Sequence, residues 1–86
     1  MSESTICYRV ELFAHLKEYV GQGSWIYEDD TQLTAKQLLN VFFDQYPALG
    51  RLRKMTRIAV NQAFCQEDSF LDPEDELALI PPVSGG

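Results

Sequence analysis

One segment near the middle of the chain most constrains the fold, because it carries the one long helical pattern in the sequence. Thr34 and Gln37 match a capping box, in which Thr34 begins a helix and Gln37 bonds back to it. The helix is expected to end at Tyr46, because Pro47 disfavours the helical conformation of the residue before it. Its apolar stripe, at helical spacing, consists of Leu38, Leu39, Phe42, Phe43 and Tyr46. Such a stripe predicts a helix that forms one half of a core.

The beginning of the chain predicts a strand followed by a short helix. Residues 5–14 alternate in character, which is typical of a half-buried strand. Residues 14–20 predict a short helix that stops at Gly21, a residue suited to a helix end. The side of the strand expected to face the core consists of Ile6, Tyr8, Val10 and Leu12.

The remaining strands are short. One is expected over residues 24–30, and two more, or a strand and its return, over residues 57–61 and 62–66. Residues 72–75 carry turn chemistry, and residues 76–80 form the last expected strand. The chain is therefore expected to run strand, short helix, strand, long helix and then three short strands.

This order in 86 residues predicts one α+β domain with a mixed sheet wrapped across one main helix. The first and last strands are the most apolar, so we expect them side by side in the centre and parallel to each other. That arrangement is the β-grasp fold of ubiquitin. Residues 1–80 are assigned to this domain and residues 81–86 to an extended C-terminal tail.

The charge of the chain argues against binding to nucleic acid. Thirteen acidic and seven basic side chains give a net charge of −6, which phosphates would repel. The one basic cluster is too short to follow a nucleic-acid backbone and is expected to mark a solvated loop. It consists of Arg51, Arg53, Lys54 and Arg57.

The sequence also argues against a membrane protein, a metalloprotein and a self-contained enzyme. No apolar run reaches the length that spans a bilayer, and no secretory signal begins the chain, so a cytoplasmic protein is expected. Cys7 and Cys65 form no metal-binding motif and are interpreted as ordinary strand thiols. His15 and Ser84 lack the neighbours that a catalytic site needs, and no metal site is expected.

The last six residues of the sequence are two prolines, then a valine and a serine, then two glycines. Glycine has no Cβ and can enter a slot too narrow for other residues, while proline favours an extended backbone. Six extended residues reach roughly 20 Å, enough to enter the active site of another protein. The tail consists of Pro81, Pro82, Val83, Ser84, Gly85 and Gly86. The pattern predicts a carrier whose own terminal carboxylate is the reacting group.

The carboxylate of Gly86 is expected to be ionised at neutral pH and able to attack the α-phosphorus of ATP. The resulting acyl-adenylate is open to attack by a sulfur nucleophile. Because the chain contains neither an ATP motif nor such a nucleophile, it is expected to be a substrate and carrier for enzymes that act on it.

Three apolar side chains are expected on the outer side of the sheet near the root of the tail. Phe13, Phe64 and Ile80 each lie on the more polar side of their strand. If the strands are neighbours, these side chains form a contiguous patch of the kind that marks an interaction surface.

The sequence resembles the small, sulfur-carrying subunit of molybdopterin synthase. The resemblance rests on residues 75–86, which end in Pro-Pro-Val-Ser-Gly-Gly, on Leu12-Phe13-Ala14 with residues 16–21, and on residues 59–62. Two positions depart from the family pattern. Glu74 stands where a glycine often precedes the last strand, and Ile80 replaces a common aromatic residue.

The resemblance implies that an adenylyltransferase of the ubiquitin-activating type uses ATP to adenylate Gly86, which then becomes a thiocarboxylate. The tail would insert into a large catalytic subunit and give its sulfur to cyclic pyranopterin monophosphate, forming molybdopterin in a heterotetramer. Phe13, Phe64 and Ile80 fall at the partner-binding contacts of the family. The chain itself would bind no cofactor, and the catalytic residues would belong to the large subunit.

Two other functions have the same tail chemistry. The chain could carry sulfur for thiazole or another sulfur-containing product, or it could be a ubiquitin-like modifier joined to lysines through Gly86. A purely structural or regulatory subunit is a third alternative. The Pro-Pro-Val-Ser lead-in and the matches along the chain favour molybdopterin over thiazole, whereas the modifier needs the same ending and is poorly discriminated by the sequence.

Overall fold

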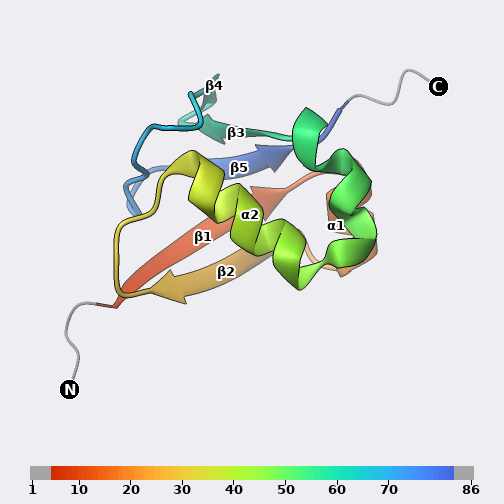
Figure 1. Ribbon diagram of the computed structural model, residues 1–86, viewed down its shortest axis with the longest axis horizontal. Helices are drawn as coiled ribbons and strands as arrows, with labels where there is room; N and C mark the ends of the chain where they lie inside the picture. Colours follow the sequence, from red (N-terminus) through yellow and green to blue (C-terminus); the bar gives the residue numbers. More distant parts are fainter. Residues whose placement is uncertain (1–4, 83–86) are drawn as a thin grey trace.

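The computed structural model describes residues 5–82 as a five-stranded mixed sheet with helices (Figure 1). The strands have the order β2-β1-β5-β3-β4. β1 and β5 are parallel, and the other neighbouring pairs are antiparallel. The elements are β1 (Ile6–Leu12), α1 (Ala14–Val20), β2 (Ser24–Asp29), α2 (Ala35–Gln45), the 3₁₀ helix η1 (Pro47–Met55), β3 (Arg57–Val60), β4 (Ala63–Phe64) and β5 (Leu77–Ile80). The predicted parallel pairing of the first and last strands is confirmed.

The alternation in β1 and β5 divides the sheet into two faces. Tyr8, Val10 and Leu12 of β1 are buried, as are Leu77 and Leu79 of β5. In the parallel register Val10 lies opposite Leu77, and Leu12 lies opposite Leu79. Because successive side chains of a strand point to opposite faces, these pairs form one apolar layer, which we call the inner face.

Helix α2 covers the inner face, as its sequence predicts. Thr34 accepts a hydrogen bond from the Gln37 backbone N–H, and the Gln37 side chain accepts one from the Thr34 N–H, which confirms the capping box. Phe42, fully buried, meets the Trp25 ring of β2 edge to face, with 5.0 Å between the ring centroids. The helix is followed by Tyr46 at its C-cap, in agreement with the expected end.

The basic segment after α2 is a helix and not the solvated loop that the sequence predicts. Residues 47–55 form η1, in which residues three apart align because a 3₁₀ helix has three residues per turn. Leu49 and Leu52 share one such row and are buried. Arg53 binds the Asn40 amide of α2 at 3.0 Å and the Glu67 carboxylate at 3.3 Å. Arg51, Arg53 and Lys54 therefore lie on a helix that a buried leucine row packs onto the core, whereas Arg57 is the first residue of β3.

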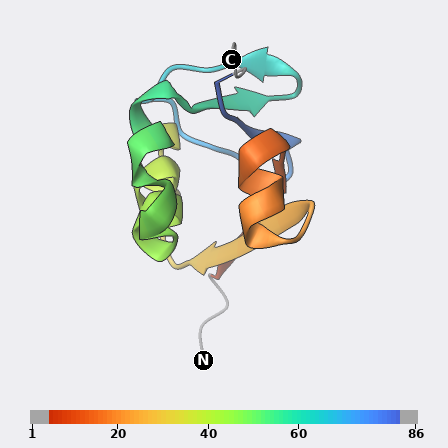
Figure 2. The ribbon, with the colours of Figure 1, turned by 90° about the vertical axis from the view of Figure 1, so that its right-hand side faces the viewer.

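Figure 2 shows α2 and η1 together on one side of the molecule and α1 on the other. The predicted bounds of α1 are confirmed, and Gly21 ends it with a φ of +84°, a conformation that glycine adopts without a Cβ clash. No helix of the described residues 5–82 is long and apolar enough to cross a membrane.

Candidate functional site

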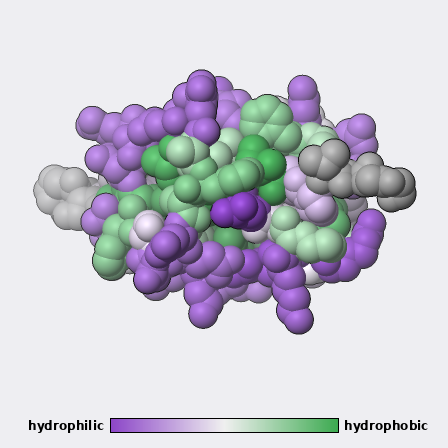
Figure 3. Space-filling view, turned by 90° about the horizontal axis from the view of Figure 1, so that it is seen from above, coloured by the Kyte–Doolittle hydropathy of each residue, from purple (hydrophilic) through white to green (hydrophobic). Residues whose placement is uncertain are grey.

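The face of the sheet opposite α2 carries a groove of about 330 Å³ beside the last residues of β5. The structure brings Phe13, Phe64 and Ile80 to this one surface, in the arrangement that the sequence predicts. Figure 3 shows the molecule from the side of β3 and β4, where apolar side chains gather among hydrophilic ones. We call this hollow the outer groove, and it is lined by Phe13, Ala59, Gln62, Phe64, Glu76, Ala78 and Ile80.

The register of the strands gives the groove a floor of small residues between large ones. Ala59 of β3 lies opposite both Ala78 of β5 and Phe64 of β4. The two alanines leave room that a larger side chain would fill, whereas Phe64 and Phe13 are 52% and 48% exposed at the sides. An apolar concavity with exposed aromatic walls is suited to receive an apolar side chain of a partner.

Phe13 is held at the groove by the turn from β1 into α1. It is the N-cap of α1, and its carbonyl oxygen accepts hydrogen bonds from the Leu16 and Lys17 N–H groups at 3.1 and 3.4 Å. Ala14 follows with a φ of +51°, an unusual conformation for a residue with a Cβ. The backbone of Phe13 therefore belongs to the helix start, while its side chain is free to line the groove.

The turn between β3 and its return strand β4 fixes the other wall of the groove; the sequence predicted the return as one of two alternatives but placed Asn61 and Gln62 in the strands. Asn61 and Gln62 join β3 to β4 with φ values of +52° and +73°, the signature of a tight hairpin turn. The Asn61 N–H donates to the Glu76 carbonyl at 2.8 Å, and the Asn61 side-chain oxygen accepts from the Glu76 N–H at 2.9 Å. Asparagine tolerates positive φ, so Asn61 before a short strand was the available signal. This double contact ties the hairpin that carries Phe64 to the start of β5.

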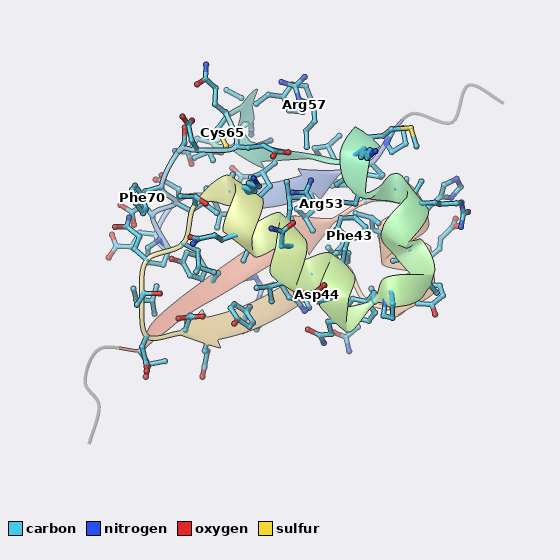
Figure 4. The ribbon with its side chains drawn as sticks, viewed as in Figure 1. Phe43, Asp44, Arg53, Arg57, Cys65 and Phe70 are labelled. Atoms are coloured by element: carbon cyan, nitrogen blue, oxygen red, sulfur yellow. The ribbon has the colours of Figure 1, made fainter. Side chains whose placement is uncertain are left out.

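Arg57 was also missed as a member of the site. Its guanidinium carbon lies 4.0 Å from the centroid of the Phe64 ring, a cation–π contact, and Arg57 lies opposite Ile80 in the register of β3 and β5. Figure 4 shows Arg57 at the β3 end of the view, and Arg57 also lines a second hollow that includes Ala35 and Leu39 of α2. The arginine therefore borders the outer groove.

The two cysteines are free thiols outside the groove lining. Cys7 is exposed on β1, whereas Cys65 follows β4 and does not lie in a strand, contrary to the sequence interpretation. Partial burial raises the pKa of the Cys65 thiol, which lowers the thiolate fraction at neutral pH.

The root of the tail lies directly after the groove residue Ile80. Pro81 is buried and Pro82 is half-buried, so the chain leaves the body close to the groove. The predicted tail residues Val83, Ser84, Gly85 and the reactive Gly86 lie outside the described residues. A partner that occupies the groove would therefore lie next to the start of the tail.

The other polar side chains do not form a catalytic arrangement in residues 5–82. His15 is exposed on α1, where its Nδ1 lies 3.8 Å from the Glu18 carboxylate. Within the same residues, no three His, Cys, Asp or Glu side chains gather as a metal site requires. The described lining of the outer groove is mainly apolar, with Glu76 as its ionisable side chain.

Comparisons with known proteins extend over nearly the whole chain. The sequence model of the ThiS family matches residues 10–86. The molybdopterin synthase sulfur carrier subunit of Dictyostelium discoideum is 33% identical over 82 residues, which covers 92% of this chain and 95% of that protein. The crystal structure of SAMP1 from Haloferax volcanii is similar with a TM-score of 0.75 and 28% identity, over 93% of this chain and 99% of that one.

A further solved structure shares the fold at lower identity. It belongs to the complex of subunits 1 and 2 of the molybdopterin-converting factor from Helicobacter pylori, with a TM-score of 0.63 and 21% identity over 94% of this chain and 100% of the matched chain. Together these similarities confirm the predicted β-grasp fold.

Proposed function

The chain belongs to the ThiS family, and from this premise we propose that it is the sulfur-carrier subunit of a molybdopterin synthase. The observation that carries the proposal is the apolar outer groove at the root of the tail, on a β-grasp body similar along its length to named sulfur carrier subunits. A carrier needs a surface by which each enzyme recognises it and a reactive end that reaches beyond that surface. The groove supplies the first, and the Gly-Gly tail supplies the second.

The chemistry takes place at Gly86. Its carboxylate oxygen attacks the α-phosphorus of ATP, pyrophosphate leaves, and an acyl-adenylate forms on an adenylyltransferase that resembles ubiquitin-activating enzymes. A sulfur nucleophile then attacks the acyl carbon, AMP leaves, and Gly86 carries a thiocarboxylate. Pro81 and Pro82 direct the chain away from β5, and Val83, Ser84 and Gly85 form the slender segment that enters a partner's active site.

The partner that accepts the sulfur is the large catalytic subunit, which contributes the catalytic residues. Phe13, Phe64 and Ile80 contact it through the outer groove. The Helicobacter pylori protein, which has the same fold, forms a complex of this kind between subunits 1 and 2 of its molybdopterin-converting factor. We propose that this chain likewise joins a large subunit, in a cytoplasmic heterotetramer, and that the product is molybdopterin made from cyclic pyranopterin monophosphate. The chain binds no cofactor of its own.

The test is a reconstituted sulfur transfer. The purified chain is incubated with ATP, the adenylyltransferase and a sulfur donor, and intact mass is expected to rise by the difference between a sulfur and an oxygen atom. The charged protein is then mixed with the large subunit and the pterin precursor, and formation of the dithiolene product is measured. The Gly86→Val variant is expected to lose transfer while it keeps the unfolding temperature of the wild type, because a side chain at the last position blocks a narrow slot. Normal transfer by this variant, or no dithiolene from the charged wild type, contradicts the proposal.

The second candidate function is a ubiquitin-like modifier. Its support is the 28% identity to SAMP1 of Haloferax volcanii, which belongs to the small archaeal modifier proteins. This function requires an amide bond between Gly86 and lysines of other proteins, so it predicts a ladder of adducts in cell lysate that disappears in the Gly86→Val variant. A carrier for thiazole synthesis shares the thiocarboxylate and is separated from the first candidate by the precursor that accepts the sulfur.

A further inference from the structure

Resting on the proposed function, we propose that Arg57 is an anchor for a carboxylate of the large catalytic subunit, held ready by the Phe64 ring at the border of the outer groove. The partner segment that fits this surface carries an aspartate or glutamate beside an apolar side chain. The apolar side chain enters the groove, and the carboxylate bonds to the guanidinium.

The geometry holds the guanidinium in place before any partner binds. Its carbon lies 4.0 Å from the Phe64 ring centroid, and Arg57 itself is exposed at the first position of β3. A guanidinium on an aromatic face keeps its N–H groups available at its edge, because the ring contacts only the plane. The conformational entropy that a free arginine would lose on binding is therefore partly lost already.

The charge environment distinguishes Arg57 from the other arginines near the sheet. Arg9 pairs with Glu11 at 3.7 Å, and Arg53 pairs with Glu67 at 3.3 Å. Within residues 5–82, Arg57 has neither a carboxylate within 4.0 Å nor a side-chain hydrogen-bond acceptor. No other residue of this described range uses the five N–H donors of Arg57, and a carboxylate can accept two of them in parallel.

The neighbouring groove explains why the ligand belongs to a protein surface. Arg57 lies opposite Ile80, and Phe64 is shared between the cation–π contact and the groove lining. A partner side chain in the groove excludes water from the adjacent ion pair, which strengthens it. Arginine and aromatic residues that meet beside an apolar pocket are the usual composition of a binding hot spot.

Arg51 provides a matched control. It is an exposed arginine only six positions earlier in the chain, on η1, and within the described residues it has neither an aromatic contact nor a place in the groove lining. Substitutions at Arg51 and Arg57 change the net charge of the protein equally. A difference between them therefore reports the position of Arg57 and not the overall charge.

The experiment measures the dissociation constant between the large subunit and the wild-type, Arg57→Ala, Arg57→Lys and Arg51→Ala chains by calorimetry. A lost bond between charged groups is expected to weaken the Arg57→Ala complex by about 10- to 100-fold. Arg57→Lys keeps the charge but not the planar fork, so it is expected to fall between wild type and Arg57→Ala. Arg51→Ala is expected to stay within about twofold of wild type. Thermal unfolding of each variant verifies that the fold is retained.

A double-mutant cycle tests the role of the ring. Phe64→Leu keeps an apolar side chain in the groove but removes the aromatic face under the guanidinium. The effect of Arg57→Ala is expected to be smaller in the Phe64→Leu background, because the Arg57 guanidinium is no longer held in place by the ring. Equal effects in both backgrounds contradict the preorganised anchor.

The outcomes separate this inference from the proposed function. If the wild-type chain does not bind the large subunit, the proposed function itself fails. If the wild type binds and Arg57→Ala binds equally well, or no more weakly than Arg51→Ala, the anchor is overturned while the function stands. The anchor is also overturned if Arg57→Ala impairs only adenylation. The carboxylate that binds Arg57 would then belong to the adenylyltransferase and not to the large subunit.

Discussion

Leu79 and Ile80 are neighbours on β5, yet they lie on opposite faces of the sheet and in different surroundings. Leu79 is fully buried, opposite Leu12 on one side and Ile58 on the other. Ile80 is half-buried, lies opposite Arg57 and lines the outer groove. One strand therefore contributes one side chain to the core and the next to the outer groove, the surface that we propose binds the partner.

The two faces differ because only one is covered within the described residues. Helix α2 packs on the inner face, where Leu38, Leu39 and Phe42 are excluded from water. The outer face keeps Phe13 and Phe64 about half exposed. Inner-face substitutions should therefore act on the free energy of unfolding, and outer-face substitutions should act on partner binding.

The largest expected effect is that of Leu79→Ala on stability. The substitution removes buried apolar atoms between Leu12 and Ile58 and leaves a cavity, which is expected to lower the free energy of unfolding by about 2–5 kcal/mol. Urea denaturation followed by the fluorescence of Trp25 measures this loss. The folded fraction of the variant should bind the large subunit as the wild type does. A stability loss of less than about 1 kcal/mol would show that the inner face is not the tightly packed core described above.

Ile80→Ala is the matched substitution one residue later. It removes a groove wall and is expected to weaken binding of the large subunit by about tenfold, while the free energy of unfolding changes by no more than about 1 kcal/mol. Calorimetric titration and urea denaturation are measured on the same preparation. An unfolding effect equal to that of Leu79→Ala, combined with unchanged binding, would remove the distinction between the faces.

The inner face could be predicted from the sequence because it depends on local periodicity. The alternation of Tyr8, Val10 and Leu12 and the stripe of Leu38 and Phe42 identified the buried side chains without knowledge of the topology. The parallel pairing of the first and last strands followed from their apolar character. The position of the groove residues Phe13, Phe64 and Ile80 also followed from alternation once those strands were placed side by side.

The remaining features of the site depend on relations that no local pattern contains. The contact of Arg57 with Phe64 requires a hairpin turn at Asn61 with positive φ, and the register across that turn cannot be read from two short strands. Helix η1 escaped prediction because its buried leucines repeat every three residues, at Leu49 and Leu52, and a period of three is not that of an α-helix.

A smaller effect is expected for a polar group on the inner face. The Tyr8 hydroxyl oxygen accepts a hydrogen bond from the buried Leu33 N–H at 2.8 Å, and Tyr8 is fully buried. Tyr8→Phe keeps the ring but leaves this N–H without that acceptor, so the free energy of unfolding is expected to fall by about 1–3 kcal/mol. Faster hydrogen exchange of the Leu33 amide should accompany the loss. Binding of the large subunit should be unchanged. A binding defect without a stability defect would contradict the assignment of Tyr8 to the stabilising inner face.

The smallest effect is expected at the solvated margin of β2 and depends on pH. The Thr31 N–H and the Tyr27 hydroxyl both donate hydrogen bonds to the Asp29 carboxylate, and these bonds lower the pKa of Asp29. A carboxyl group with a lower pKa in the folded than in the unfolded state stabilises the fold above its unfolded pKa, about 3.9, and this contribution is lost as the pH falls through the folded value. The Asp29→Asn variant cannot titrate there, so its stability should fall less steeply than that of the wild type below about pH 4.

Because Asp29 lies at the surface, solvent and salt screen the effect, and urea denaturation between about pH 2 and pH 7 at low salt offers the clearest measurement. Identical pH profiles for the two proteins would mean that these hydrogen bonds are no stronger in the folded chain than the hydration they replace. The margin of the inner face would then contribute nothing to its stability, and the contrast between the two faces would rest on the buried side chains alone.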